Sequence, residues 1–365
     1  MKESVINHFL DYEFVYIFLF CSIICLLISI FIKYQLVRKI SILFFSMLFI
    51  LFGFEFGLSF FMEKIDPDFK PNFYLDLNNK QIKKYREIKT KEYTKMMKSE
   101  DYDFEYYEKT YDVVYSVYNN GLRYVKCDSS SADSYAFLGC SFTFGDGVND
   151  DETLPYYFSE LYNFKSNVLN LGVRGHSSNT ALNILNNEIF LPFMDKKSEM
   201  KHFFYSLLYD HMYRNFRVLC NEPSDGYILK DKKYVIIQPI VKFKYLFAMS
   251  YIFRKVCLPV IDEYFRQYYE DYLIKSLEEM NKIVEEKYDS KLTIIAWTDL
   301  DNLKIDDFMN RLRQTNLDLI FLPEYFNFEE EGYKIKDDGH PTAKANEEIA
   351  KILYNHINGL EQRNL

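Results

Sequence analysis

The fold of this chain is decided by the stretch Leu138-Gly139-Cys140-Ser141-Phe142-Thr143-Phe144-Gly145. It follows Ser134-Tyr135-Ala136-Phe137, so an apolar run typical of a buried strand ends in small residues at a tight turn, and a helix pattern begins after Gly147. The turn between a strand and a helix is where open α/β sheets place reactive groups. A serine at a strand end is more often a cap or turn residue than a nucleophile, so this turn alone does not indicate catalysis.

A second stretch, Asp337-Asp338-Gly339-His340-Pro341, lies far downstream and also opens a helix. A serine hydroxyl is a poor nucleophile until a base takes its proton, and an imidazole is suited to that task at neutral pH. His340 is the candidate base. Asp337, three residues earlier, is the candidate acceptor for the other ring N–H, which would fix the tautomer of the imidazole. Pro341 is acceptable in the first turn of the helix.

These two stretches, with Asn170-Leu171-Gly172-Val173-Arg174-Gly175 between them, resemble the first, second and last sequence blocks of the SGNH (GDSL-type) hydrolases. The resemblance extends over roughly residues 112–356. Within it, Asn119-Asn120-Gly121-Leu122-Arg123 resembles a lead-in found in one branch, the membrane-anchored branch with a Gly-Cys-Ser-Phe-Thr-Phe-Gly first block. The resemblance implies a three-layer α/β/α fold and an esterase that forms an acyl-serine.

The resemblance also implies that the backbone N–H groups of Ser141 and Gly175 stabilise an oxyanion. The family's third donor is an asparagine in a Gly-x-Asn-Asp block, but here the stretch Tyr205-Ser206-Leu207-Leu208-Tyr209-Asp210-His211 contains no asparagine. The first block also departs from the family pattern, with Cys140 in place of aspartate. We interpret Cys140 as a buried small residue and not as the nucleophile, because its side chain should point away from that of Ser141.

In the branch that this chain resembles, an Asp-His pair followed by Arg and Asn takes the place of the missing block, which corresponds here to Asp210, His211, Arg214 and Asn215. Either Asp210 or His211 is then the third oxyanion residue. An ionised Asp210 would repel an oxyanion, so it points away or His211 donates instead. His176, Arg214 and Asn215 are candidate substrate-binding residues. We therefore expect a variant site and not an inactive one.

Apolar runs alternate with helix patterns through residues 111–365, which we take as the catalytic domain. Strands are expected at 134–138, 168–173, 202–209, 291–297 and 317–322, and helices at 152–162, 178–190, 264–287, 304–314 and 342–356. Alternation of this kind predicts a three-layer α/β/α sandwich with a mainly parallel, flavodoxin-like sheet. The insertion 216–262 breaks the alternation and predicts an extra ribbon, and Asn119-Asn120-Gly121 predicts a hairpin turn.

Two apolar stretches near the N-terminus, within residues 14–33 and 40–62, are each long enough to cross about 30 Å of hydrocarbon as a helix. They predict a transmembrane hairpin over residues 1–62, followed by a charged, partly helical stem over 63–110. A cleaved signal peptide is the alternative for the first stretch, but no cleavage site of the usual kind follows it. The connection contains Lys33, Arg38 and Lys39 and no acid, which favours a cytoplasmic loop and an extracytoplasmic catalytic domain.

The composition argues against several classes of function. A net charge of −9 speaks against nucleic acid as the main partner, and no Gly-rich phosphate loop is present. The 6 cysteines form no Cys-x-x-Cys pair, and the histidines are scattered without carboxylate spacing. We therefore expect neither a metal site nor a cofactor.

The sequence leaves three functions open. The first is a membrane-anchored serine esterase that cleaves an acyl ester, with O-acetyl favoured, on a cell-envelope glycan or lipid. The second is an O-acyltransferase that uses the same Ser-His-Asp site and receives acyl groups from a membrane partner protein; it differs only in whether water or a bound hydroxyl attacks the acyl-serine. The third is a catalytically inactive SGNH-type protein that binds glycans or assists assembly. The expected partners are an acylated small molecule or glycan and membrane lipid.

Overall fold

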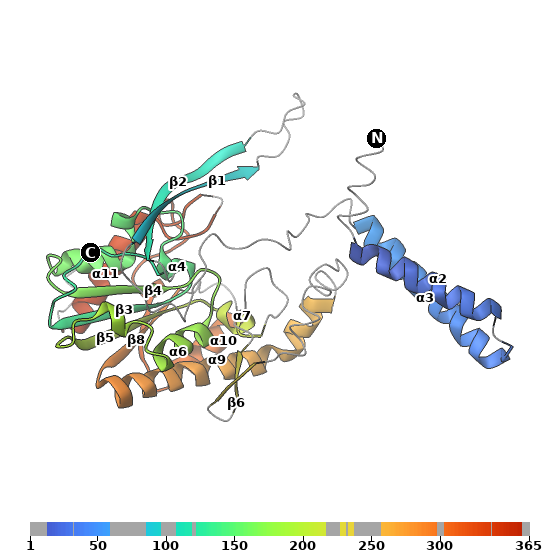
Figure 1. Cartoon of the computed structure of the whole chain (residues 1–365). Helices are drawn as coiled ribbons and strands as arrows, with labels where there is room; N and C mark the ends of the chain where they lie inside the picture. Colours follow the sequence, from blue (N-terminus) through green and yellow to red (C-terminus); the bar gives the residue numbers. More distant parts are fainter. Residues whose placement is uncertain are drawn as a thin grey trace. The chain divides into compact units, whose positions relative to one another are not determined.

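The computed structural model describes residues 13–31, 33–58, 85–95, 107–118, 122–216, 227–230, 233–236, 257–297, 303–336 and 338–359 (Figure 1). The N-terminal helices, together with residues 258–267, belong to one compact unit of the chain, and the sheet with the remaining parts of its covering helices belongs to another. Each unit is described by itself.

The second unit is built on a 5-stranded sheet in the order β4-β3-β5-β8-β9, and every neighbouring pair is parallel. The strands are β3 (Asp133–Gly139), β4 (Asn167–Gly172), β5 (Glu199–Leu207), β8 (Lys291–Ala296) and β9 (Asp318–Phe321). Counted along the chain, this is the 2-1-3-4-5 order of doubly wound folds, in which ligands bind beyond the carboxyl ends of the strands. The predicted parallel α/β sheet is confirmed.

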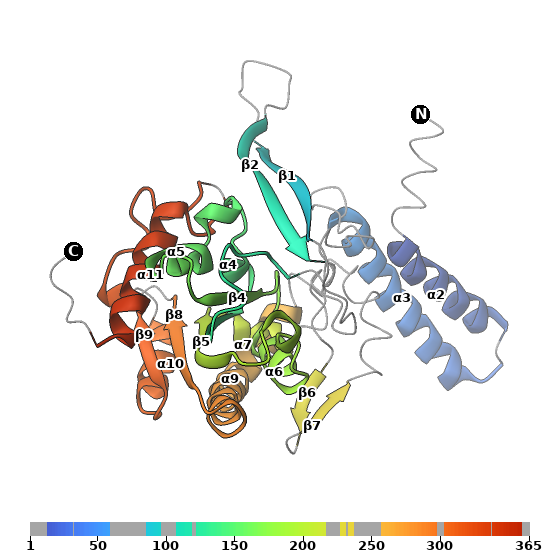
Figure 2. The same ribbon diagram turned by 60° about the vertical axis from the view of Figure 1, so that its left-hand side comes forward.

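Helices cover both faces of the sheet (Figure 2). One face packs against α6 (Ser178–Asn186), α9 (Leu258–Tyr288) and α10 (Leu303–Arg313), and the other against α5 (Leu154–Leu161) and α11 (Ala343–Ile357). Successive strand residues point to opposite faces, so Leu138 and Tyr205 lie in the first core while Phe137 and Phe204 lie in the second. Both cores are rich in aromatic and aliphatic side chains, as expected for strands buried on both faces.

Short helices lie in the connections between the strands and the longer helices of this unit. They are α4 (Ser141–Phe144), η1 (Asp150–Glu152), η2 (Leu191–Phe193), α7 (His211–Arg214) and η4 (Leu322–Glu324). Both α4 and α7 begin within a few residues of the carboxyl end of a strand, so they bring polar side chains to one edge of the sheet.

An antiparallel ribbon precedes the sheet and consists of β1 (Tyr85–Lys95) and β2 (Tyr107–Tyr118). The sequence analysis expects a partly helical stem here, but residues 85–95 are a strand. The many charges of these residues hide the alternation of a strand in the sequence. In the structure the residues pair with the apolar-rich β2. The predicted turn residues 119–121 lie outside the described residues, although Val117 and Arg123 on either side pair in antiparallel fashion.

The insertion 216–262 is described only in part. It contains a 2-stranded ribbon of β6 (Tyr227–Lys230) and β7 (Lys233–Ile236), which agrees with the extra ribbon expected there. Residues 217–226, 231–232 and 237–256 lie outside the described residues.

The N-terminal unit contains α2 (Glu13–Phe31) and α3 (Gln35–Leu58), which pack against each other. Within the described residues one helix is long and apolar enough to cross a membrane: Gln35–Gly53, with a mean hydropathy of 2.0 and none of its length buried. The sequence analysis predicts two such helices. A shorter apolar stretch within the described residues, Leu19–Phe31, lies in α2, so the first of the two spans stays a prediction.

A chain of polar contacts joins three neighbouring strands of the sheet and α11. Nε2 of the buried His202 lies 2.7 Å from Oγ1 of Thr293, whose hydroxyl donates to Asp318 at 2.5 Å. Asp318 in turn lies 2.9 Å from Nε2 of His356 on α11. Burial lowers the pKa of His202 to about 4. By contrast, the hydrogen bond to Asp318 raises the pKa of His356 above its ordinary value.

We expect His202 to make the protein acid-sensitive. The unfolded chain binds this proton with a pKa of about 6.5 and the folded chain with a pKa of about 4, so stability falls as the pH drops below about 6.5 and levels off below about 4. The loss between pH 7 and pH 5 is about 2 kcal/mol by the same linkage relation. Urea unfolding of wild type and His202→Gln at the two pH values should show this loss only in wild type.

His356→Gln is the matched control, because the pKa of His356 is raised and its contribution has the opposite sign. That group adds stability below its unfolded pKa, and the gain disappears as the pH rises through the folded pKa. Its replacement should therefore make the protein more acid-sensitive. Equal pH dependence in wild type and the His202 variant would contradict the assignment.

Candidate active site

Ser141 is held at the carboxyl end of β3 by a turn that requires glycine. Gly139 has φ +149°, and a Cβ there would lie 2.3 Å from Oγ1 of Thr143. On the neighbouring strand a Cβ at Gly172 would lie 2.3 Å from the backbone nitrogen of Phe144. These close approaches allow the chain to enter α4 directly after Cys140, so Ser141 becomes the first helical residue. Cys140 itself is fully buried, as expected.

Ser141 and His340 meet across 199 positions of sequence. Nε2 of His340 lies 2.8 Å from Oγ of Ser141, and Nδ1 lies 2.5 Å from Oδ1 of Asp338. The same carboxylate oxygen accepts the backbone N–H of His340 at 3.1 Å. Asp337, the acid expected from the sequence, lies outside the described residues. Asp338 therefore makes the contact that the sequence analysis assigns to Asp337.

The environment keeps Asp338 ionised. Burial alone would raise its pKa, but the hydrogen bonds and the charge of His340, helped by Arg174, hold the pKa below its ordinary value. A carboxylate at Nδ1 fixes the tautomer in which Nδ1 donates and Nε2 accepts. Ser141 is 7% exposed, so its hydroxyl is largely removed from water. The arrangement is that of a serine with a general base and an orienting acid.

The loop before α11 is braced so that His340 keeps this position. The backbone nitrogen of Ile335 donates to the carbonyl of His340 at 2.8 Å, and that of Thr342 donates to the carbonyl of Tyr333 at 3.0 Å. Thr342 then caps α11 through its hydroxyl. His340 therefore lies in a loop that is closed by backbone hydrogen bonds within the loop itself.

Gly175 lies beside the serine turn, as expected from its sequence block. Gly139 and Gly172 are register partners at the ends of β3 and β4, and the nitrogen of Val173 donates to the carbonyl of Gly139 at 2.9 Å. Gly175 has φ +75° in the turn that follows. The N–H groups of the first helical residues have no partner inside their helix, which leaves that of Ser141 suited to an oxyanion. The donor roles of Ser141 and Gly175 stay predictions.

A buried ion pair joins these two loops. Nε of Arg174 lies 2.6 Å from Oδ2 of Asp146, which is 3% exposed. Burial raises the pKa of Asp146, although Arg174 and His340 act against it. Arg174 immediately precedes Gly175, and Asp146 follows Gly145, the residue that ends α4. The sequence analysis missed this pair, because nothing in the spacing of the two residues signals their contact.

Arg123 lies beneath the serine turn, and its guanidinium is fully enclosed. Its Nη1 donates to the carbonyls of Phe144 and Gly145 at 2.9 and 2.5 Å, and its Nη2 donates to that of Val148 at 2.8 Å. Its Nε donates to Asp150 at 3.0 Å. Burial lowers the pKa of Arg123, and Asp150 opposes the shift. Arg123 ends the lead-in motif, which therefore serves to support the serine turn.

The Asp-His-x-x-Arg-Asn stretch is placed at the end of β5. Asp210 accepts from Nε of Arg214 at 2.7 Å, so its carboxylate is held by that cation. His211 is fully buried, and burial lowers its pKa well below the ordinary value. Its Nδ1 accepts the backbone N–H of Leu208 at 3.5 Å and lies 2.8 Å from the hydroxyl of Tyr205. The proton of this neutral ring is therefore on Nε2, which has no hydrogen-bond partner among the described residues.

The other predicted substrate-binding residues contact their own chain. Asn215 is buried, and its Oδ1 accepts from the hydroxyl of Ser177 at 2.6 Å, which fixes the start of α6 after the Gly175 turn. Nδ1 of His176 lies 2.6 Å from Oγ1 of Thr180. Substrate contacts by His176, Arg214 and Asn215 stay predictions.

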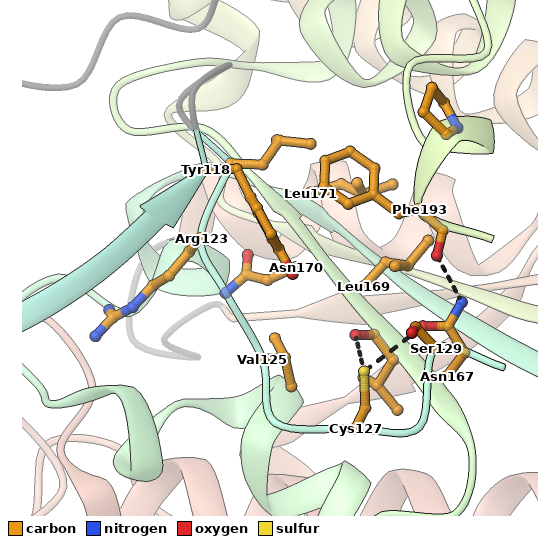
Figure 3. Close-up of a pocket in the computed structure, with 13 residues that line it drawn as sticks. Tyr118, Arg123, Val125, Cys127, Ser129, Asn167, Leu169, Asn170, Leu171 and Phe193 are labelled. Carbon is orange, nitrogen blue, oxygen red and sulfur yellow. Dashed lines mark hydrogen bonds between the residues drawn. The ribbon is translucent and has the colours of Figure 1, made fainter. Parts of the chain in front are cut away.

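Two cavities of similar size, both lined by described residues, bear on where a substrate could bind. One, of about 200 Å³, has Phe142 and Gly339 in its lining, the residues that adjoin Ser141 and His340. The other, of about 220 Å³, lies along β4, an edge strand, and contains none of the predicted site residues (Figure 3). Cys127 lies at one end of it, with Sγ 3.5 Å from the carbonyl of Val168. The first cavity is the one that a substrate of Ser141 would reach.

Within the described part of the chain, no three His, Cys, Asp or Glu side chains are grouped so that they could hold a metal ion.

No family model and no curated protein matches this chain. Solved structures similar to it include TesA, with 11% identity, coverage of 62% of this chain and 99% of that chain, and a TM-score of 0.37. A lipolytic protein of the G-D-S-L family from Veillonella parvula DSM 2008 has 13% identity, coverages of 64% and 100%, and a TM-score of 0.37. Axe2, an acetylxylan esterase from Geobacillus stearothermophilus, has 11% identity, coverages of 64% and 99%, and a TM-score of 0.36. The function proposed below rests on the geometry of the site.

Proposed function

We propose that this chain is a serine esterase that cleaves acyl esters through an acyl-serine intermediate. The observation that carries the proposal is the line of contacts from Oγ of Ser141 through the ring of His340 to Asp338, at 2.8 and 2.5 Å. A hydroxyl, an imidazole and a carboxylate in this order supply a nucleophile, its base and the group that orients the base.

The reaction proceeds in two halves. The Ser141 proton moves to Nε2 of His340 as Oγ attacks the ester carbonyl carbon, and the oxyanion is stabilised by the N–H groups of Ser141 and Gly175. The carbon–oxygen bond to the alcohol then breaks, and His340 returns the proton to the leaving oxygen. In the second half water attacks the acyl-serine, with His340 again taking and returning a proton. Each oxyanion donor contributes about 3 to 4 kcal/mol in comparable sites.

For the third oxyanion donor we favour His211 over Asp210. A carboxylate held by Arg214 has no proton to donate, whereas Nε2 of His211 carries one that lacks a partner among the described residues. A neutral imidazole that donates to a developing oxyanion needs a depressed pKa, and burial supplies it.

We further propose that the enzyme is anchored in a membrane and acts on the extracytoplasmic side. The apolar length of α3 supports the anchor, and the basic connection of Lys33, Arg38 and Lys39 supports a two-pass hairpin with its loop in the cytoplasm. A location at the envelope suggests esters on a cell-envelope glycan or lipid, of which the O-acetyl ester carries the smallest common acyl group.

This topology predicts that reporters fused before residue 1 and after residue 365 are both active outside the cytoplasm. The expected result follows from the excess of Lys and Arg in the short connection. A reporter that is extracytoplasmic at the C-terminus and cytoplasmic at the N-terminus would instead show a single pass through α3. A cytoplasmic C-terminus would overturn the proposed side.

The esterase proposal is tested by the intact mass of the full chain, purified in detergent, after treatment with a fluorophosphonate or with p-nitrophenyl acetate. One adduct is expected, and it should be absent in Ser141→Ala. Sugar acceptors added to the acetyl-enzyme would reveal acyl transfer by forming an acetylated sugar. A folded wild-type chain with no adduct would favour the non-enzymatic, glycan-binding alternative.

A further inference from the structure

The cavity beside the serine turn is lined mainly by apolar groups. It extends from Phe142 across the carboxyl ends of β5, β8 and β9. Its apolar lining consists of Phe142, Leu208, Trp297, Leu322, Pro323, Phe328 and Gly339. Gly175, one of the predicted oxyanion donors, follows β4 and so lies on the other side of β3 from the cavity.

Three aromatic rings form the wall nearest to the catalytic residues. The rings of Phe142 and Trp297 meet edge to face at 5.0 Å between centroids, and those of Trp297 and Phe328 do so at 5.4 Å. Phe142 also lies 5.3 Å from the ring of His340. Trp297 is 8% exposed, so this wall is preformed and held by the core beneath it.

The charged residues of the lining satisfy each other. Lys334 forms an ion pair with Glu329, and its Nζ lies 5.0 Å from the centre of the Phe328 ring. The indole N–H of Trp297 has no hydrogen-bond partner among the described residues. A sugar ring placed here would bury several hydroxyls with few partners, which is unfavourable. An alkyl chain would lose no hydrogen bonds and would remove apolar surface from water.

From these features we infer that the cavity binds the acyl part of the substrate, and that this part is an apolar chain longer than acetyl. The inference rests on the proposed esterase function. In the acyl-serine the acyl group stays attached to Oγ of Ser141, next to Phe142 of the cavity wall, whereas the alcohol takes its proton from His340 and leaves. A polar alcohol therefore remains outside, and the cavity of about 200 Å³ selects the acyl group. This replaces acetyl as the preferred group.

The kinetic test compares two ester series on the full chain. In p-nitrophenyl acetate, butyrate and hexanoate only the acyl group grows, and in ethyl, butyl and hexyl acetate only the alcohol grows. Each buried methylene should raise kcat/KM by up to about fourfold in the first series until the cavity is full. The second series should be flat. A rise with the alcohol and none with the acyl group would overturn the inference.

Phe328→Ala should flatten the acyl series, because it removes one wall of the cavity while leaving Ser141 and His340 in place. Tyr325→Ala is the matched control, since Tyr325 is an exposed aromatic residue of the same loop that does not line the cavity. The control should keep the chain-length dependence of wild type. Equal slopes in the two variants would show that the cavity does not hold the chain.

A binding test separates this inference from the esterase proposal. Trp297 is the single tryptophan of the chain, so its fluorescence reports on the cavity directly. In Ser141→Ala, kept in digitonin to avoid alkyl detergents, hexanoate should change the emission saturably and acetate should not. A hexanoate response without any Ser141 adduct in wild type would refute the esterase and leave the acyl-chain site standing. A normal adduct with no hexanoate response would support the esterase and refute the acyl-chain site.

Discussion

Replacing Ser141 with alanine is expected to lower kcat for ester hydrolysis on the order of 10⁶-fold, with little change in KM. The hydroxyl that lies 2.8 Å from Nε2 of His340 is the protein group that forms a bond to the acyl carbon in the proposed reaction. Its loss removes the covalent step, while the cavity beside it is unchanged. Steady-state hydrolysis of p-nitrophenyl esters by the full chain in detergent measures the effect.

The neighbouring thiol provides the control for this variant. Cys140 is fully buried, and its replacement by alanine should leave acyl-enzyme formation intact. Thermal unfolding should show that both variants remain folded. Activity that survives in Ser141→Ala but disappears in Cys140→Ala would mean that the thiol is the nucleophile and that our assignment is wrong.

Replacing Asp338 with asparagine is expected to lower kcat by about 10⁴-fold, the size of effect seen when the orienting acid of a serine enzyme is neutralised. An amide in place of the carboxylate that lies 2.5 Å from Nδ1 would donate to the ring and favour the wrong tautomer. The amplitude of the burst and the steady-state rate are measured with the same ester. Together they distinguish a loss of kcat from a loss of folded enzyme.

Asp337→Asn is the matched comparison, because it makes the same chemical change one residue away. If Asp338 is the acid, the Asp337 variant should retain its kcat within a few fold. A large loss in the Asp337 variant and a small one in the Asp338 variant would restore the assignment made from the sequence spacing. The two variants together therefore decide which carboxylate orients His340.

The sequence predicts the parallel sheet because its signals are local. The apolar run before Gly139 and the helix pattern after Gly147 are contiguous, and the same holds for the other strand and helix pairs. It misjudges β1, since a strand can carry the many charges that are equally typical of a solvated helix. Of the two predicted membrane spans, one is found as a long apolar helix among the described residues.

The serine and the histidine of the site are predictable because each lies in a short motif. The choice between Asp337 and Asp338 is not, since it depends on how the loop closes, with the nitrogens of Asp338 and Gly339 both donating to the carbonyl of Ile335. The pair of Asp146 and Arg174 depends on two separate loops coming together. Contacts of this kind arise from tertiary packing, which motif spacing does not encode.

The separation of 199 positions between Ser141 and His340 has a consequence for the order in which the enzyme is made. At about 5 to 20 residues per second, a ribosome adds the base about 10 to 40 s after the nucleophile. The residues that support the serine turn, among them Arg123 and Arg174, have been synthesised by then. The nascent chain thus carries an inert hydroxyl until the base is added.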